Sequence, residues 1–199
     1  MTLVLLDTNA YLRLAKRIRP ILGVKFGQKE YVVTILKDVE EEVHRSPALR
    51  FKFPWFDDGD LAAERMAATM RLSTEEKEKL SIAQSVLHGW VLTDIRRYTT
   101  GGRSPPSITD CRVLAFGQIR QAVVVTDDIG MHDLAKDFDI TVWHGPELLA
   151  KMRTAKMVSN ELIREIFEAL ESNGDQTATW RNAKHTTFAK TFGTQKKEK

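Results

Sequence analysis

Four acidic residues occupy positions from which their carboxylates could bind a cation. They are Asp7 in VLLDTNAY, Glu42 in ILKDVEEEV, Asp110 in SITDCRVLAFG and Asp128 in VVVTDDIGM. Each lies where an expected strand ends or an expected helix begins. Carboxylates that crowd together repel one another, so such a cluster persists only if a cation or shared protons neutralise it. Because oxygen ligands of this kind suit Mg²⁺ or Mn²⁺, the sequence predicts a hard-metal site.

The elements that would position these acids are visible as local patterns. Short apolar runs rich in β-branched residues predict strands buried on both faces. The expected strands are residues 3–6, 31–35, 123–126 and 140–143. Helical patterns lie between them, with expected helices at 8–16, 37–44, 60–72 and 75–97, and with a further one that Ser107 or Thr109 caps.

Alternating strands and helices predict a parallel sheet that helices cover on both faces. Ligands of such folds bind beyond the carboxyl ends of the strands. Asp7 and Asp128 both fall within two residues of the carboxyl end of an expected strand. The pattern therefore favours one shared site at that edge of the sheet.

Length and composition limit the class of protein. A chain of 199 residues is expected to form one domain with an appendage, and 42% hydrophobic residues are enough for a core. Cys111 is the single cysteine, so no internal disulfide forms. The opening MTLVLLD lacks the basic region of a signal peptide, and no apolar run is long enough to span a membrane. We therefore expect a cytoplasmic protein.

The charge of the chain is uneven. Residues 1–150 carry 20 Lys and Arg against 21 Asp and Glu, whereas residues 151–199 carry 10 against 6. The closing segment alone thus makes the protein basic. A KKEK end is typical of a solvated terminus, and a contact with nucleic acid is the alternative.

The closing segment also contains one clear amphipathic pattern. The apolar face at 159–172 consists of Leu162, Ile163, Ile166, Phe167 and Leu170. A helix this short is marginal alone in water, so we expect its apolar face to pack on the core. The expected organisation is a domain at 1–150 and an α-helical extension with a basic tail at 151–199. Residues 175–199 show weak periodicity, and their candidate anchors are Trp180, Phe188 and Phe192.

Taken in order, the acidic motifs resemble a known family. LLDTNAYL follows the first strand, a Val-x-x-Glu-Val pattern lies on the second helix, SITD opens a later helix and VVVTDD closes a strand. This ordered set, over roughly residues 1–145, resembles the PIN domain. The resemblance implies a three-layer α/β/α fold with a parallel sheet of about four to five strands.

The resemblance assigns roles residue by residue. Asp7 matches the first acid of the family, Asp110 the third, and Asp128 the fourth through a Thr-x-Asp motif, which leaves Asp127 at the variable position. The second acid lies in the run of Glu40, Glu41 and Glu42. Glu42 is the choice because Val43 follows it, and Glu41 is the second choice.

The resemblance further implies an activity and partners. PIN domains of this kind are Mg²⁺- or Mn²⁺-dependent endoribonucleases, and many are toxins of toxin–antitoxin pairs. The expected substrate is RNA, the expected products carry 5′-phosphate and 3′-hydroxyl ends, and the expected partner is an antitoxin protein. A homodimer is also compatible with the family. Hard cations that activate water and stabilise the leaving oxygen suit a phosphodiester.

Two other functions are compatible with parts of the pattern. A PIN-like fold could serve as a non-catalytic RNA-binding or assembly module, which the complete acidic set disfavours. A phosphatase with an aspartyl nucleophile would need a second Asp two residues after Asp7, where the chain has Asn9. The five histidines are scattered, and with one cysteine they form no zinc motif.

Overall fold

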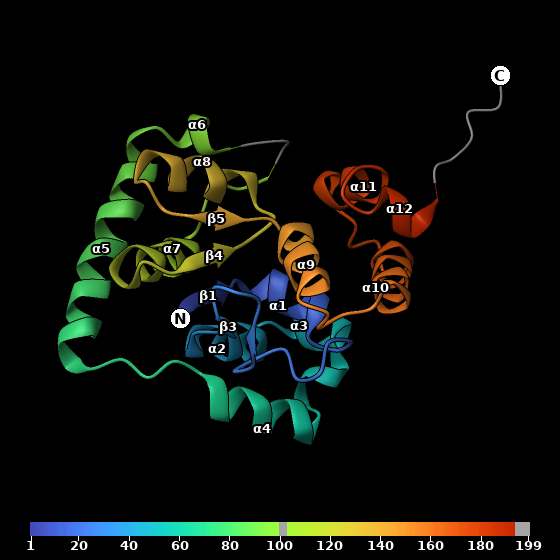
Figure 1. Cartoon of the computed structure of the whole chain (residues 1–199). Helices are drawn as coiled ribbons and strands as arrows, with labels where there is room; N and C mark the ends of the chain where they lie inside the picture. The colour runs from blue at the N-terminus through green and yellow to red at the C-terminus, as the bar shows by residue number, and fades with distance from the viewer. Residues whose placement is uncertain (100–102, 194–199) are drawn as a thin grey trace.

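A five-stranded sheet forms the centre of the computed structural model, which describes residues 1–99 and 103–193 (Figure 1). The strands are β1 (Thr2–Leu6), β2 (Lys25–Phe26), β3 (Tyr31–Thr34), β4 (Val123–Val125) and β5 (Val142–Trp143). Their order is β2-β3-β1-β4-β5, and every neighbouring pair is parallel except β2 with β3. The predicted α/β class with a mostly parallel sheet is therefore confirmed.

Helices account for most of the remaining chain. Those before β4 are α1 (Thr8–Leu14), α2 (Lys37–Arg45), α3 (Pro47–Lys52), the 3₁₀-helix η1 (Pro54–Asp57), α4 (Gly59–Ala68), α5 (Thr74–Thr93), α6 (Ile95–Tyr98) and α7 (Ile108–Arg120). Those after β4 are α8 (Ile129–Asp137), α9 (Gly145–Thr154), α10 (Asn160–Ser172), α11 (Ala178–His185) and α12 (Ala189–Phe192). Among the described residues, none of the helices has the length and apolar character needed to cross a bilayer.

The sheet separates two hydrophobic cores. Successive side chains of a strand point to opposite faces, so Val4 and Leu6 of β1 join one core while Leu5 joins the other. The first core also takes side chains from α1, α2, α9 and α10, and the second takes them from α5, α7 and α8. Helices thus lie on both faces, in the layered arrangement that the sequence predicts.

The C-terminal helices belong to the first core. Ile163, Ile166 and Phe167 of α10 are fully buried in it, which confirms that the amphipathic face packs on the core. Trp180 of α11 and Phe188 before α12 are fully buried there as well. Figure 1 shows α10, α11 and α12 at one end of the molecule, opposite α5. Helix α9 runs without a break across the expected boundary at residue 150.

Several element boundaries differ from the sequence prediction. The expected helix at 75–97 is divided, because Asp94 has a non-helical backbone and its side chain accepts a hydrogen bond from the Arg97 N–H to begin α6. The expected helix at 60–72 ends at Ala68, after which Thr69 is extended. Strand β2 was not predicted; it has two residues and lies at the sheet edge, so it carries no periodic signal.

Candidate functional site

The carboxyl ends of β1 and β4 bring two of the predicted acids to the same edge of the sheet. These strands are parallel neighbours, with Leu6 paired to Val125. The Asp7 N–H donates a 3.1 Å hydrogen bond to the Val125 carbonyl, so Asp7 lies beside the start of the β4–α8 loop. That loop carries Thr126 and Asp128, and it reaches the shared edge that the pattern predicts.

Asp7 is a buried carboxyl group with a strongly perturbed pKa. It caps α1 by accepting a hydrogen bond from the Ala10 N–H at 2.5 Å, and only 6% of the residue is exposed. The pKa of Asp7 is raised to about 7, mainly because of burial and with a smaller contribution from the charge of Asp127, although hydrogen bonds from Thr126 and Ala10 and the charge of Arg13 lower it. A cation beside this carboxylate would oppose the effect of burial by favouring the ionised form.

The three consecutive glutamates of α2 point in three different directions. Glu42 accepts a 2.6 Å hydrogen bond from the hydroxyl of Thr8, the residue that follows Asp7. Glu41 pairs with Lys37 and Arg45 on the same helix. Glu40 pairs at 2.9 Å with the buried guanidinium of Arg65 on α4. Only Glu42 therefore faces the edge that carries Asp7.

Asp110 lies in the first turn of α7 and takes part in a capping box. Its carboxylate accepts from the Ser107 N–H at 2.7 Å, and its own N–H donates to the Ser107 hydroxyl at 3.2 Å. Burial raises the pKa of Asp110, and the negative charge of Asp128 raises it further. Helix α7 packs against α8, and Asp110 and Asp128 lie at the N-terminal ends of these two helices.

Asp128 caps the next helix in a similar way. Its carboxylate accepts from the Met131 N–H at 2.9 Å, and its own N–H donates to the Thr126 hydroxyl at 3.1 Å. Both Asp110 and Asp128 thus have a structural use at a helix N-terminus. Each cap leaves carboxylate lone pairs that can accept further bonds.

A small cavity connects α2 with the start of α7. It has a volume of about 270 Å³, and its lining includes Glu42 and Thr109, the residue before Asp110. Glu42 is thus hydrogen-bonded to Thr8, the residue next to Asp7, and Asp110 and Asp128 lie at the N-terminal ends of the packed helices α7 and α8. Within residues 1–99 and 103–193, however, no three His, Cys, Asp or Glu side chains are arranged closely enough to hold one metal ion.

The donor chemistry of the four acids fits a hard cation. All four offer oxygen atoms, and two of them have a pKa raised by burial and by a neighbouring carboxylate. Mg²⁺ commonly uses only one or two carboxylates, with waters and substrate phosphates as its other ligands. A Mg²⁺ ion bound in this way would not need a group of three protein carboxylates.

Asp127, which the sequence pattern leaves at a variable position, accepts three hydrogen bonds at this edge. Its carboxylate accepts hydrogen bonds from Arg13 at 3.0 Å, from the Gly145 N–H at 3.0 Å and from the Trp180 indole N–H at 2.6 Å. Burial alone would raise the pKa of Asp127, but the His144 ring, the Arg13 charge and the indole hold it below its usual value. Asp127 therefore stays ionised and organises the β4–α8 loop between its two neighbours, Thr126 and Asp128.

Two histidines support the same loop. The ring of His132 stacks on that of His144 with centroids 3.8 Å apart, and its Nε2 lies 2.9 Å from the Thr126 carbonyl oxygen. A carbonyl only accepts, so this nitrogen donates. Burial is the main cause of the lowered pKa of His132, which favours the neutral ring. His132 thus fixes the backbone of the loop.

Comparisons of the chain with protein-family models, with curated proteins and with solved structures found no match.

Proposed function

We propose that this chain is a PIN-like, Mg²⁺- or Mn²⁺-dependent endoribonuclease. The observation that carries the proposal is the hydrogen bond from the Thr8 hydroxyl to Glu42, which brings the α2 carboxylate to the residue that follows Asp7 at the carboxyl end of the central strand. Asp110 and Asp128, at the N-terminal ends of the packed helices α7 and α8, add two further carboxylates.

The four carboxylates would hold the metal, and the metal would supply a bound water for attack and charge stabilisation at the phosphate. The protein's own groups prepare this edge. Asp127 holds the β4–α8 loop through Arg13 and Trp180, so Asp128 keeps its position. The Thr8 hydroxyl orients Glu42, and the cap to Ala10 orients Asp7.

The motif resemblance also supports a biological setting. We propose that the enzyme is a toxin that a cognate antitoxin neutralises in the cytoplasm, and that it can form a homodimer. The test is co-expression: induction of the chain alone should stop growth, and an Asp7→Asn variant should not. Rescue by the product of a small adjacent gene would identify the antitoxin.

Cleavage is tested directly with purified protein and a labelled single-stranded RNA. Mn²⁺ should stimulate cleavage by the wild type, and Asp7→Asn or Asp128→Asn should reduce it by more than about 100-fold, because loss of groups that merely support metal ligands costs about 10–100-fold. Asp133→Asn on α8 is the matched control. RNA binding without metal-dependent cleavage would instead favour the non-catalytic RNA-binding module. That module is the second candidate, because no group of three potential metal ligands occurs among the described residues.

A further inference from the structure

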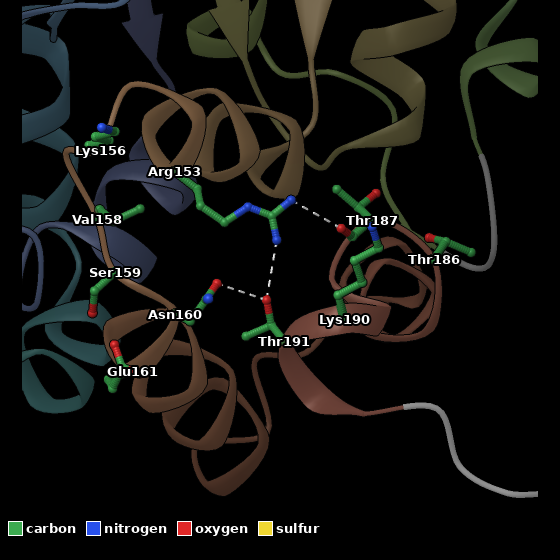
Figure 2. A pocket seen from close by; sticks show the side chains of 10 residues that line it. All are labelled: Arg153, Lys156, Val158, Ser159, Asn160, Glu161, Thr186, Thr187, Lys190 and Thr191. Carbon is green, nitrogen blue, oxygen red and sulfur yellow. Dashed lines mark hydrogen bonds between the residues drawn. The ribbon is translucent and has the colours of Figure 1, made fainter.

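A basic pocket lies in the C-terminal extension, outside the acidic edge. It has a volume of about 800 Å³ and is formed by the end of α9, the start of α10 and the segment that leads into α12 (Figure 2). Its lining includes the cations Arg153, Lys156 and Lys190 and the hydroxyl groups of Ser159, Thr187 and Thr191.

The central cation of this pocket is held in place. Arg153 Nη1 donates to the Thr191 hydroxyl oxygen at 3.2 Å and Nη2 donates to the Thr187 carbonyl at 3.3 Å (Figure 2). Thr191 is 4% exposed, and its hydroxyl donates in turn to Asn160 at 3.0 Å. The guanidinium also lies over the Phe188 ring, 4.9 Å from its centroid. A fixed guanidinium loses little entropy when it binds an anion.

The positive charge of the pocket is not compensated locally. In the described part of the chain, no carboxylate oxygen lies within 4.0 Å of the charged nitrogens of Arg153, Lys156 or Lys190. Glu161 is the one acid of the lining, and it pairs at 3.7 Å with Arg164. Three cations around one cavity repel one another, and an anion between them would relieve that repulsion.

Helix α9 connects this pocket to the acidic edge. The N–H of Gly145 at its start donates to Asp127, and Arg153 stands in its last turn. A helix of ten residues is about 15 Å long. A ligand with phosphates repeated along a chain could therefore reach both ends of α9, whereas a single small phosphate ester could not.

We propose that the pocket binds a backbone phosphate of a single-stranded RNA whose scissile bond lies at the acidic edge. This inference depends on the proposed nuclease function for the choice of RNA, and it adds a second point of contact on the chain's own extension. The recognised group is a phosphate, and contact with it carries no base sequence.

The test measures RNA binding without cleavage. An Asp7→Asn protein in EDTA is titrated with a labelled oligouridylate at several salt concentrations, alone and with Lys156→Gln and Lys190→Gln together. The matched control combines Lys77→Gln with Lys136→Gln, two exposed lysines of α5 and α8. Each phosphate contact on a single strand contributes about 0.7 to the slope of log affinity against log salt, so loss of the one phosphate contact in the pocket should flatten the slope by up to about 0.7.

The outcomes separate the two proposals. A weaker affinity and a flatter slope in the pocket variant, but not in the control variant, would support the phosphate site. A failure of the wild type to cut RNA with Mn²⁺ would contradict the proposed nuclease function but not the phosphate site. Equal affinities and slopes in pocket and control variants would overturn the pocket assignment. Pocket-dependent binding to vesicles that contain phosphatidic acid, without pocket-dependent RNA binding, would overturn the choice of RNA.

Discussion

The indole N–H of Trp180 donates a 2.6 Å hydrogen bond to the carboxylate of Asp127, 53 residues earlier in the chain. Trp180 is fully buried, and Asp127 is 4% exposed. Through this bond α11 is attached to the loop that carries Asp128. The extension therefore supports the acidic edge and is more than an independent basic tail.

Removal of that indole donor should destabilise the fold. In Trp180→Phe the Asp127 oxygen keeps its bond from Arg13 but loses the one from the indole, and a hydrogen bond to a charged group contributes about 1.5–3 kcal/mol. The free energy of unfolding, measured in urea with EDTA, should fall by at least that amount. Trp55→Phe is the control, because Trp55 is only partly buried at the margin of the same core. An equal loss in both variants would show that the hydrogen bond contributes nothing beyond aromatic packing.

The same contact requires a glycine at position 145. A Cβ there would lie 2.6 Å from the Trp180 ring and 3.3 Å from the Asp127 carboxylate. Gly145→Ala should therefore destabilise the protein by about 1–3 kcal/mol, the usual range for overpacking. Gly89→Ala in α5 meets nothing within 4 Å and should instead stabilise it by about 0.5–1 kcal/mol through helix propensity. Thermal melts of the two variants should shift in opposite directions.

The raised pKa of Asp7 predicts a pH-dependent stability in the metal-free protein. Its pKa is about 7 in the fold against an ordinary value of 3.8, so between these values the folded state binds the additional proton. Stability from this group should consequently fall as pH rises from about 4 to 7 and remain low above that. Asp7→Asn carries no such charge, so its stability relative to wild type should increase with pH. Urea unfolding in EDTA at pH 5 and pH 8 measures the difference in unfolding free energy between the two proteins. A difference that is the same at both pH values would contradict the raised pKa of Asp7.

Substitutions along the glutamate run should separate three roles. Glu42→Gln should abolish most RNA cleavage, because the Glu42 carboxylate is the one that is hydrogen-bonded to Thr8, the residue next to Asp7. Glu41→Gln should change neither cleavage nor stability by much, since surface substitutions stay within about 0.5 kcal/mol.

Glu40→Gln should act on the fold instead. The substitution leaves the guanidinium of Arg65, which is 2% exposed, without its carboxylate partner. Because the Glu40 side chain is partly exposed, the free energy of unfolding should fall by only about 1–3 kcal/mol. Cleavage assays at a temperature where all three variants are folded, together with thermal melts, distinguish these outcomes. Loss of cleavage at Glu41 equal to that at Glu42 would move the second acid by one position.

The sequence by itself determined the local elements and where their polar ends lie. Apolar runs located β1, β3 and β4, and the amphipathic spacing of α10 predicted its packing, because strand burial and helix periodicity are properties of neighbouring residues. The sequence narrowed each of two helix caps to a pair of candidates, Asp7 or Thr8 and Ser107 or Thr109, of which Asp7 and Ser107 are the caps in the structure. The phase of α2 relative to Val43 also singled out Glu42.

Only the tertiary structure decided which distant groups meet. Arg13 and Trp180 lie 114 and 53 residues from Asp127 in sequence, and no periodic or capping signal spans such separations. The sequence left Asp127 at a variable position, yet chain topology gives it three hydrogen-bond donors in a buried setting. The pocket around Arg153 likewise needs three segments of the extension to converge. Such sites arise from strand order and helix packing, which are set by long-range burial and not by local pattern.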